Sequence, residues 1–269
     1  MIKFFEIIKA PLPYLKFHQR ILLKIFLLIF GKYIRYQNEQ ILQNASEPVI
    51  FAFNHNNTFE TVLIALFLIY KRQGRKISFV VDWMYGKLPF IGWLLKQVDP
   101  IYVYNKPARW KIINRMKRGI SKKNVYFQCA KRLSENQSIA IFPEGTRNKS
   151  PNVLMRGRKG IGEIVLQTNA PVIPIGIDFP LREDSGKIPS FGSVFFNFGK
   201  KIQFNEEVML ARSYQHNRYI NKSQERRLNI YLCKKISHRI MLKLSELSGK
   251  SYPYQLPENK QFKWALTVM

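Results

Sequence analysis

The chain has 269 residues, of which 46% are apolar and 14% aromatic, so a disordered chain is excluded and a substantial core is expected. Its 44 Lys and Arg residues against 17 Asp and Glu give a formal charge of +27, which indicates a nucleic acid, an acidic membrane surface or a polyanionic substrate as partner. Cys129 and Cys233 lie far apart and the four histidines are scattered, so we predict reduced core cysteines and no metal site.

Residues 1–40 are predicted to form an amphipathic helical membrane anchor. The apolar run from Ile21 to Phe30 is too short for a transmembrane helix, which needs about 20 apolar residues, and no signal-cleavage site follows it. On a helical wheel, Arg20, Lys24, Lys32 and Arg35 form a narrow basic stripe beside a broad apolar surface. Such a helix suits the headgroup layer of a bilayer. Packing of this helix on the rest of the protein is the alternative, and different faces can do both.

Residues 41–269 are predicted to form one α/β domain that ends in a long C-terminal helix. Short apolar runs predict strands at Val49–Phe53, Ile77–Val81, Ile101–Tyr104, Ser138–Phe142 and Pro171–Ile177, and a later strand pair at Ser193–Phe198 and Lys201–Phe204. Helices are expected at Thr61–Arg72, Phe90–Gln97, Arg109–Arg118, Val125–Glu135, Gly157–Thr168 and Gln224–Leu247. Apolar strands that alternate with helices predict a mostly parallel sheet flanked by helices.

The first chemical motif follows the first of these strands. His55 stands just after the strand and Glu60 five residues later, where a helix opens. Ligands bind at the carboxyl ends of strands in parallel sheets. A histidine there can act as a general base while a carboxylate orients its imidazole. The alternative is a loop histidine followed by an acid in the first turn of a helix.

A second motif, Phe142-Pro143-Glu144-Gly145-Thr146-Arg147, follows the strand Ser138–Phe142. Gly145 permits a tight turn, and the guanidinium of Arg147 presents a planar fork that suits a phosphate. Glu144 can hold this arginine or accept a substrate hydroxyl. Lys106, after the strand Ile101–Tyr104, is a further candidate for an anionic group.

Together these motifs resemble the glycerophospholipid acyltransferase family, whose best-known members are the bacterial 1-acyl-glycerol-3-phosphate acyltransferases. The resemblance rests on His-x4-acid, on the six-residue motif ending in Arg147, and on the apolar segment Ala170–Gly176, and spans roughly Ile50 to Ile177. It implies an α/β acyltransferase domain, acyl-CoA or acyl-carrier protein as donor, and no cofactor. The family usually has aspartate where this chain has Glu60, and arginine near Val103 where this chain has Asn105 and Lys106.

The resemblance implies a role for each candidate residue. His55 would deprotonate the free hydroxyl of a lysophospholipid, most simply 1-acyl-glycerol-3-phosphate, and Glu60 would orient it. Substrate contacts are expected from the following residues: Lys106, Glu144, Gly145, Thr146, Arg147 and Lys159.

The basic surface then faces anionic lipid at the cytoplasmic side of a membrane. Between Lys106 and Arg132 the chain has ten Lys or Arg and no acid. Another lysolipid or glycerol 3-phosphate as acceptor, a relative inactivated through Glu60, and a nucleic-acid-binding protein are the alternatives. The last has no recognised nucleic-acid-binding motif behind it, so no nucleic acid is expected.

Overall fold

The computed structural model describes residues 2–42, 48–87, 89–104, 125–180, 186–216 and 221–256. Its helices are α1 (Phe4–Lys9), α2 (Phe17–Phe30), α3 (Thr58–Lys71), α4 (Pro89–Lys96), α6 (Val125–Ser134), α7 (Gly160–Thr168), α9 (Asn205–His216) and α10 (Lys222–Ser248). Its strands are β1 (Ile34–Gln37), β2 (Ile50–Phe53), β3 (Ile77–Asp82), β4 (Ile101–Val103), β5 (Ser138–Ile141), β6 (Val172–Asp178) and β7 (Val194–Phe198). Short 3-10 helices occupy Gly31–Tyr33, Glu39–Leu42 and Trp83–Lys87.

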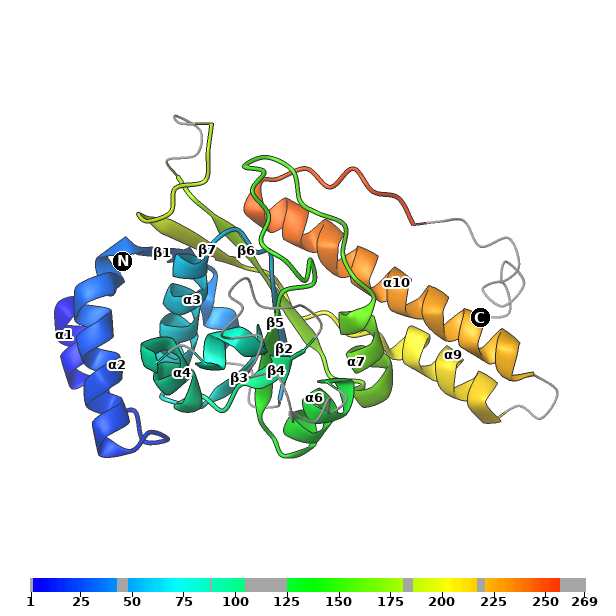
Figure 1. Ribbon diagram of the computed structural model, residues 1–269, viewed down its shortest axis with the longest axis horizontal. Helices are drawn as coiled ribbons and strands as arrows, with labels where there is room; N and C mark the ends of the chain where they lie inside the picture. Colours follow the sequence, from blue (N-terminus) through cyan, green and yellow to red (C-terminus); the bar gives the residue numbers. More distant parts are fainter. Residues whose placement is uncertain are drawn as a thin grey trace.

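The strands of the described residues form one sheet in the order β1-β7-β6-β2-β5-β3-β4. Each neighbouring pair is parallel except β6 with β7, which is antiparallel. The predicted mostly parallel sheet flanked by helices is therefore confirmed. In Figure 1 the helices α1 to α4 gather on one side of the strands, and α6, α7, α9 and α10 on the other.

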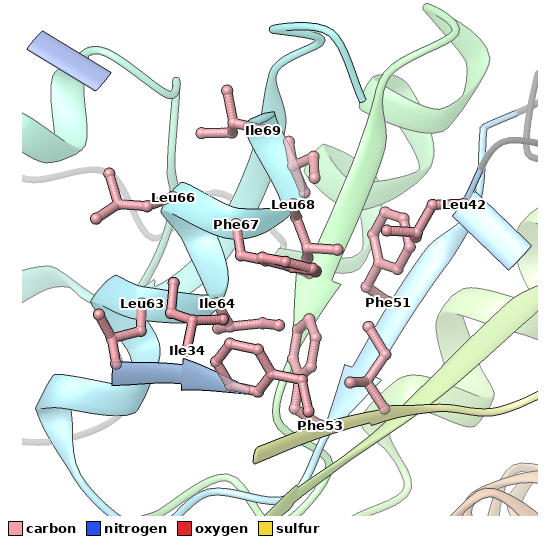
Figure 2. Packing of buried hydrophobic residues seen from close by; sticks show 14 of the residues in the cluster. Ile34, Leu42, Phe51, Phe53, Leu63, Ile64, Leu66, Phe67, Leu68 and Ile69 are labelled. Atoms are coloured by element: carbon pink, nitrogen blue, oxygen red, sulfur yellow. The ribbon is translucent and has the colours of Figure 1, made fainter. Parts of the chain in front are cut away.

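Alternating residues of β2 fill the two hydrophobic cores. Phe51 and Phe53 pack with the helix α3 and with Leu23 and Leu27 of α2, and Figure 2 shows several of these contacts. Ile50 and Ala52 point to the other face, where α6, α7 and α10 cover the sheet. Because both faces are covered, all four residues of β2 are buried, as is typical of a central parallel strand.

The late strand pair was predicted incorrectly. Residues 201–204 form no strand; Ile202 makes a single bridge with Val172, while β7 pairs with β6 and β1. The sequence prediction also missed α9 and the strand β1. The segment Arg109–Arg118 lies outside the described residues.

The N-terminal residues differ in two ways from the predicted single helix with a basic stripe. The helix α2 ends at Phe30, and Arg35 lies on β1, an edge strand of the sheet. A boundary at residue 40 therefore assigns a strand of the domain to the anchor. The stripe is also partly engaged by protein: Lys24 Nζ donates to the Ile8 carbonyl at 2.6 Å, and Arg20 Nε to the Leu15 carbonyl at 2.8 Å. These bonds tie α2 to α1 and to the turn between them.

Two glycines allow α10 to approach the core at backbone distance. A Cβ atom on Gly162 of α7 would lie 2.2 Å from the Cys233 carbonyl oxygen, and one on Gly176 of β6 would lie 2.4 Å from the Leu247 carbonyl carbon. Any side chain at either position would therefore force α10 outward. This close packing brings the residues that follow α10 to the carboxyl ends of the central strands, beside the candidate site.

Candidate active site

The loop that carries His55 is held in place by a side chain that continues the sheet. Asn54 follows β2 and is fully buried. Its Nδ2 donates to the Ile177 carbonyl of β6 at 2.8 Å, and its Oδ1 accepts from the Ile177 N–H at 2.6 Å. Asn54 thus extends the β2–β6 pairing by one residue after the backbone has turned away, and His55 emerges at the carboxyl end of the strand.

The predicted hydrogen bond between His55 and Glu60 is confirmed. His55 Nδ1 lies 2.9 Å from Glu60 Oε1. The same carboxylate accepts from the Asn56 N–H at 2.5 Å and from Asn56 Nδ2 at 3.0 Å. Asn57 caps α3 by accepting from the Glu60 N–H at 2.9 Å, which fixes the first turn of the helix. Glu60 is completely buried, so its carboxylate is fully committed to this loop.

This arrangement determines which nitrogen of His55 is free for chemistry. A carboxylate that already accepts from Asn56 can only accept from Nδ1, so Nδ1 carries the hydrogen and Nε2 has the lone pair. The imidazole stacks on Phe142 with ring centroids 4.1 Å apart, and its side chain is 17% exposed. The ring is therefore held by the hydrogen bond at Nδ1 and by the stacking on one face, and part of it remains exposed to solvent. This arrangement suits a general base.

Glu144 joins the two sequence motifs. One carboxylate oxygen accepts from the His55 N–H at 2.7 Å, and the other accepts from the Met155 N–H at 2.8 Å and from Asn148 Nδ2 at 3.2 Å. The side chain is 1% exposed. Burial raises the pKa of this carboxyl, while the N–H donors of His55 and Met155, then Asn148 and the charge of Lys250, act to lower it.

The predicted contact of Glu144 with substrate is not what this geometry provides. Its two oxygens are occupied by three protein donors, and no part of the group faces solvent. Glu144 instead fixes the His55 loop relative to the loop that follows β5. Its two motif neighbours lie nearer the surface: Gly145 adopts a φ of +65°, which favours glycine, and Thr146 is half-buried.

Arg147 connects the second motif to the start of α3. Its Nη1 donates to Thr58 Oγ1 at 3.2 Å, and the side chain is exposed. The guanidinium therefore lies at the protein surface, beside the N-terminus of α3. Both features favour an anion: the guanidinium carries the charge, and the first N–H groups of a helix point outward.

Lys250 is a residue of the site that sequence reasoning missed. It follows Gly249, whose left-handed backbone ends α10, and it is 2% exposed. Its Nζ donates to Asn56 Oδ1 at 2.5 Å. Asn56 in turn donates to Glu60, so the ammonium stands behind the His55–Glu60 pair and also lowers the pKa of Glu144. Nothing local marks this lysine, because 194 residues separate it from Asn56 in sequence.

Replacement of Lys250 by methionine is expected to lower kcat about tenfold and the free energy of unfolding by about 2 kcal/mol. The variant leaves Asn56 Oδ1 without its charged donor and removes the positive charge that lowers the pKa of the buried Glu144 carboxyl. Steady-state kinetics and denaturant titration measure the two effects.

Lys243→Met is the matched control, since Lys243 lies on α10, seven residues before Lys250, in a surface ion pair with Glu246 and should change either quantity little. A Lys250→Met enzyme that loses stability but keeps kcat would show that Lys250 does not position the catalytic loop.

Of the two remaining candidates, the one that the structure describes, Lys159, does not join this cluster. Lys159 forms an ion pair with Glu163 at 2.5 Å on the first turn of α7 and is half exposed. Lys106 lies outside the described residues. Burial raises the pKa of the Cys129 and Cys233 thiols to about 12, which supports the prediction that they are reduced core residues. In the described part of the chain no group of three His, Cys, Asp or Glu residues is placed to hold a metal ion.

Comparisons with known proteins found the following similarities. A family model described as "Acyltransferase" matches residues 33–178, from the start of β1 to the end of β6. The chain is 26% identical over 158 residues to "1-acyl-sn-glycerol-3-phosphate acyltransferase BAT2, chloroplastic" of Brassica napus; the match covers 58% of this chain and 39% of that protein, well under half its length. A crystal structure of the 1-acyl-sn-glycerophosphate (LPA) acyltransferase PlsC from Thermotoga maritima is 14% identical, with a TM-score of 0.47, 89% of this chain covered and 87% of that one.

Proposed function

Since this chain belongs to the acyltransferase family, we propose that it transfers a fatty acyl group from acyl-CoA or acyl-carrier protein to the free hydroxyl of a lysophospholipid. The single observation that carries the proposal is the hydrogen bond from His55 Nδ1 to the buried Glu60, which leaves Nε2 available as a base. The preferred acceptor is 1-acyl-glycerol-3-phosphate. It is the substrate named for the Brassica napus relative, and its phosphate monoester matches Arg147.

The mechanism that this geometry supports needs no covalent intermediate on the enzyme. Nε2 of His55 takes the proton of the acceptor hydroxyl as that oxygen forms a bond to the thioester carbonyl carbon. The resulting imidazolium is stabilised by the Glu60 carboxylate at Nδ1. Collapse of the tetrahedral intermediate breaks the C–S bond, and the leaving thiolate receives the proton from Nε2.

Arg147 gives the acceptor its orientation in this proposal. A phosphate held by the guanidinium and the N-terminus of α3 would lie near Thr58, three residues along the chain from His55. The hydroxyl of a glycerol backbone is close to its phosphate, so one phosphate contact can direct the hydroxyl toward Nε2.

An acyl-transfer assay over a panel of acceptors tests the proposal. The panel contains lysophosphatidate, other lysophospholipids and glycerol 3-phosphate, each with acyl-CoA and with acyl-carrier protein as donor. We expect the highest kcat/KM with lysophosphatidate. Transfer only to another acceptor would overturn the substrate assignment, and an absence of transfer to every acceptor would overturn the enzymatic proposal in favour of a non-catalytic relative. Tighter binding to duplex DNA than to anionic vesicles at equal salt would favour the nucleic-acid alternative.

We propose that α1 and α2 hold the protein on an anionic membrane, with the active site at the cytoplasmic surface. No helix among the described residues is long and apolar enough to cross a bilayer. Large apolar side chains are nevertheless exposed along both helices: Phe4, Phe5, Ile8, Phe17, Ile21, Ile25, Leu28 and Ile29. Figure 1 shows the two helices side by side at one end of the molecule. Such an apolar surface, flanked by lysines, is typical of helices that lie in the headgroup layer.

Loss of two of these rings should weaken membrane binding. Phe5 and Phe17 are 72% and 77% exposed, and we expect the double change Phe5→Ser/Phe17→Ser to lower partitioning into anionic vesicles more than tenfold. Burial of a phenylalanine side chain contributes about 1.5–3 kcal/mol, so loss of two rings lowers the partition coefficient more than tenfold. Sedimentation with vesicles measures the effect. Met209→Ser on α9, which removes an apolar side chain that is 67% exposed, should leave partitioning unchanged; equal losses in both variants would contradict the proposal.

A further inference from the structure

A polar cavity that begins at Arg156, one residue after Met155, has no role in the mechanism above. Its volume is about 200 Å³, enough for several water molecules or a phosphate group. It is lined by Arg156, Gly157, Lys159, Lys234, His238, Tyr252, Gln255 and Leu256. These residues come from the segment before α7, from one face of α10, and from the segment after α10, which runs back along that helix in Figure 1.

The wall formed by the C-terminal segment is fixed by backbone pairing. The Leu154 N–H donates to the Ser251 carbonyl at 2.8 Å, and the Ser251 N–H donates to the Asn152 carbonyl at 2.8 Å. Tyr252 follows directly, and its hydroxyl accepts from the Gly157 N–H at 3.4 Å. The hydrogen of this hydroxyl therefore points elsewhere and can be donated to a ligand in the cavity.

The charge of the cavity is unbalanced. Arg156, Lys159 and Lys234 line it, and none of its described lining residues is acidic. Lys159 has a counter-charge in Glu163 of α7, while the salt bridges of the described chain include neither Arg156 nor Lys234. Burial, and after it the charge of Arg156, lower the pKa of His238, so the positive charge of Arg156 reaches this side of the cavity.

The cavity is linked to the catalytic loop by hydrogen bonds, and Arg147 does not line it. The Met155 N–H donates to Glu144, whose other oxygen holds the His55 N–H, so Arg156 is one residue from this chain of bonds. Arg147 instead reaches Thr58 on α3. The molecule thus offers two separate basic positions in this region. The substrates of the proposed reaction carry two separate phosphates, one on the acceptor and one on the donor.

We propose that the cavity lined by Arg156, Lys234, His238 and Tyr252 binds the phosphate of the acyl donor's phosphopantetheine arm. This inference rests on the proposed function and names the donor's part of the site. The arm is common to CoA and to acyl-carrier protein, and its phosphate is separated from the thioester by a flexible chain. Because of this chain, a phosphate can bind at a site beside the catalytic loop while the thioester reaches His55. The acceptor phosphate remains with Arg147.

Calorimetric binding of three probes to the full-length protein tests the inference without turnover. CoA and 4′-phosphopantetheine carry the phosphate of the arm, and pantetheine lacks it. We expect binding of the first two to be at least tenfold tighter than that of pantetheine, since charge-assisted hydrogen bonds to a phosphate are lost. Equal affinities for phosphopantetheine and pantetheine would overturn the proposal.

Charge reversal in the cavity gives the second arm of the test. Lys234→Glu should weaken binding of both phosphate-bearing probes about 10- to 100-fold and raise the KM for the donor, with the KM for lysophosphatidate unchanged. Arg226→Glu is the charge-matched control, because Arg226 is exposed on the same helix, eight residues or about 12 Å away, and does not line the cavity. Equal losses in both variants would show a general effect of charge and overturn the proposal.

The kinetic arm separates the sources of the phosphate. A raised KM for acyl-CoA alone identifies CoA as the donor, and a raised KM for acyl-carrier protein alone identifies the carrier; both support the cavity as the donor site. A raised KM for lysophosphatidate with unchanged CoA binding would assign the cavity to the acceptor and overturn the proposal. If CoA binding depends on Lys234 but no acceptor is acylated, the cavity stands and the proposed function fails.

Discussion

Replacement of His55 by glutamine is expected to lower kcat for acyl transfer by about 10²- to 10⁴-fold, the range that loss of a general base gives. Glutamine is polar, and its amide nitrogen can still donate to Glu60, so the loop keeps its partner. It has no lone pair that can take a proton near neutral pH. The hydroxyl of the acceptor would then attack without a base, while the binding of both substrates is retained.

The measurement should separate chemistry from binding and from folding. We expect the KM values to change less than threefold, because His55 acts on the hydroxyl only as it reacts. Circular dichroism and thermal unfolding should match the unchanged protein. His18→Gln is the control, since His18 is exposed on α2 and far along the chain from the motifs. Wild-type kcat in the His55→Gln variant would rule out the proposed mechanism.

The parts of the site that sequence predicts are those that follow strands within short local motifs. His55 and Glu60 are five residues apart, and the turn of α3 brings them together once Asn57 caps the helix. Likewise, Glu144 follows β5, and β5 lies beside β2 in the sheet. Neighbouring parallel strands bring the residues after their carboxyl ends together. The prediction of an α/β fold therefore already places the two motifs in one site.

What sequence could not predict depends on contacts between distant segments. The strand β1 follows α2 after a single 3-10 turn and has only four residues, Ile34–Gln37, of which one is buried. Its strand character comes from pairing with β7, about 160 residues later. Lys250 illustrates the same limit at the site. A lysine after a helix is ordinarily a solvated residue, and only the close approach of α10 at Gly162 and Gly176 buries it against Asn56.

The role predicted for Glu144 differs from the observed one, because the sequence does not show that the fold buries this side chain. In the sequence its place before Gly145 and Arg147 suggested a contact with the arginine or with substrate. In the structure its oxygens hold the N–H groups of His55 and Met155. A buried carboxylate that accepts several protein donors fixes loops, and removal of it would leave those donors unsatisfied. Glu144 therefore contributes to catalysis by holding His55 in position.

Changes at Glu60 test whether this chain depends on glutamate where its family usually has aspartate. Glu60→Gln is expected to lower kcat by about 10³-fold with little change in KM. The amide oxygen can accept from His55 Nδ1 and from the Asn56 N–H, but it carries no charge to stabilise the imidazolium, and the amide nitrogen meets the Asn56 Nδ2 donor. Steady-state kinetics with both substrates measures the effect.

Glu60→Asp provides the informative comparison, because it keeps the charge and withdraws it by one carbon–carbon bond, about 1.5 Å. The carboxylate now makes bonds of 2.9, 2.5 and 3.0 Å to His55 and Asn56, and a shorter side chain cannot keep all three without moving α3. A displacement of this size can reduce the rate about 10²-fold, so we expect Glu60→Asp to fall between the wild type and Glu60→Gln.

A double variant, His55→Gln/Glu60→Gln, should be no slower than His55→Gln alone, because Glu60 acts through the imidazole. Additive losses would show that Glu60 has a separate function. Full activity in Glu60→Gln would show that the buried carboxylate serves only the loop, and the cost would then appear in the free energy of unfolding. The three kinetic results together distinguish a positioning carboxylate from a structural one, and they decide whether glutamate at this position preserves the family's chemistry in this chain.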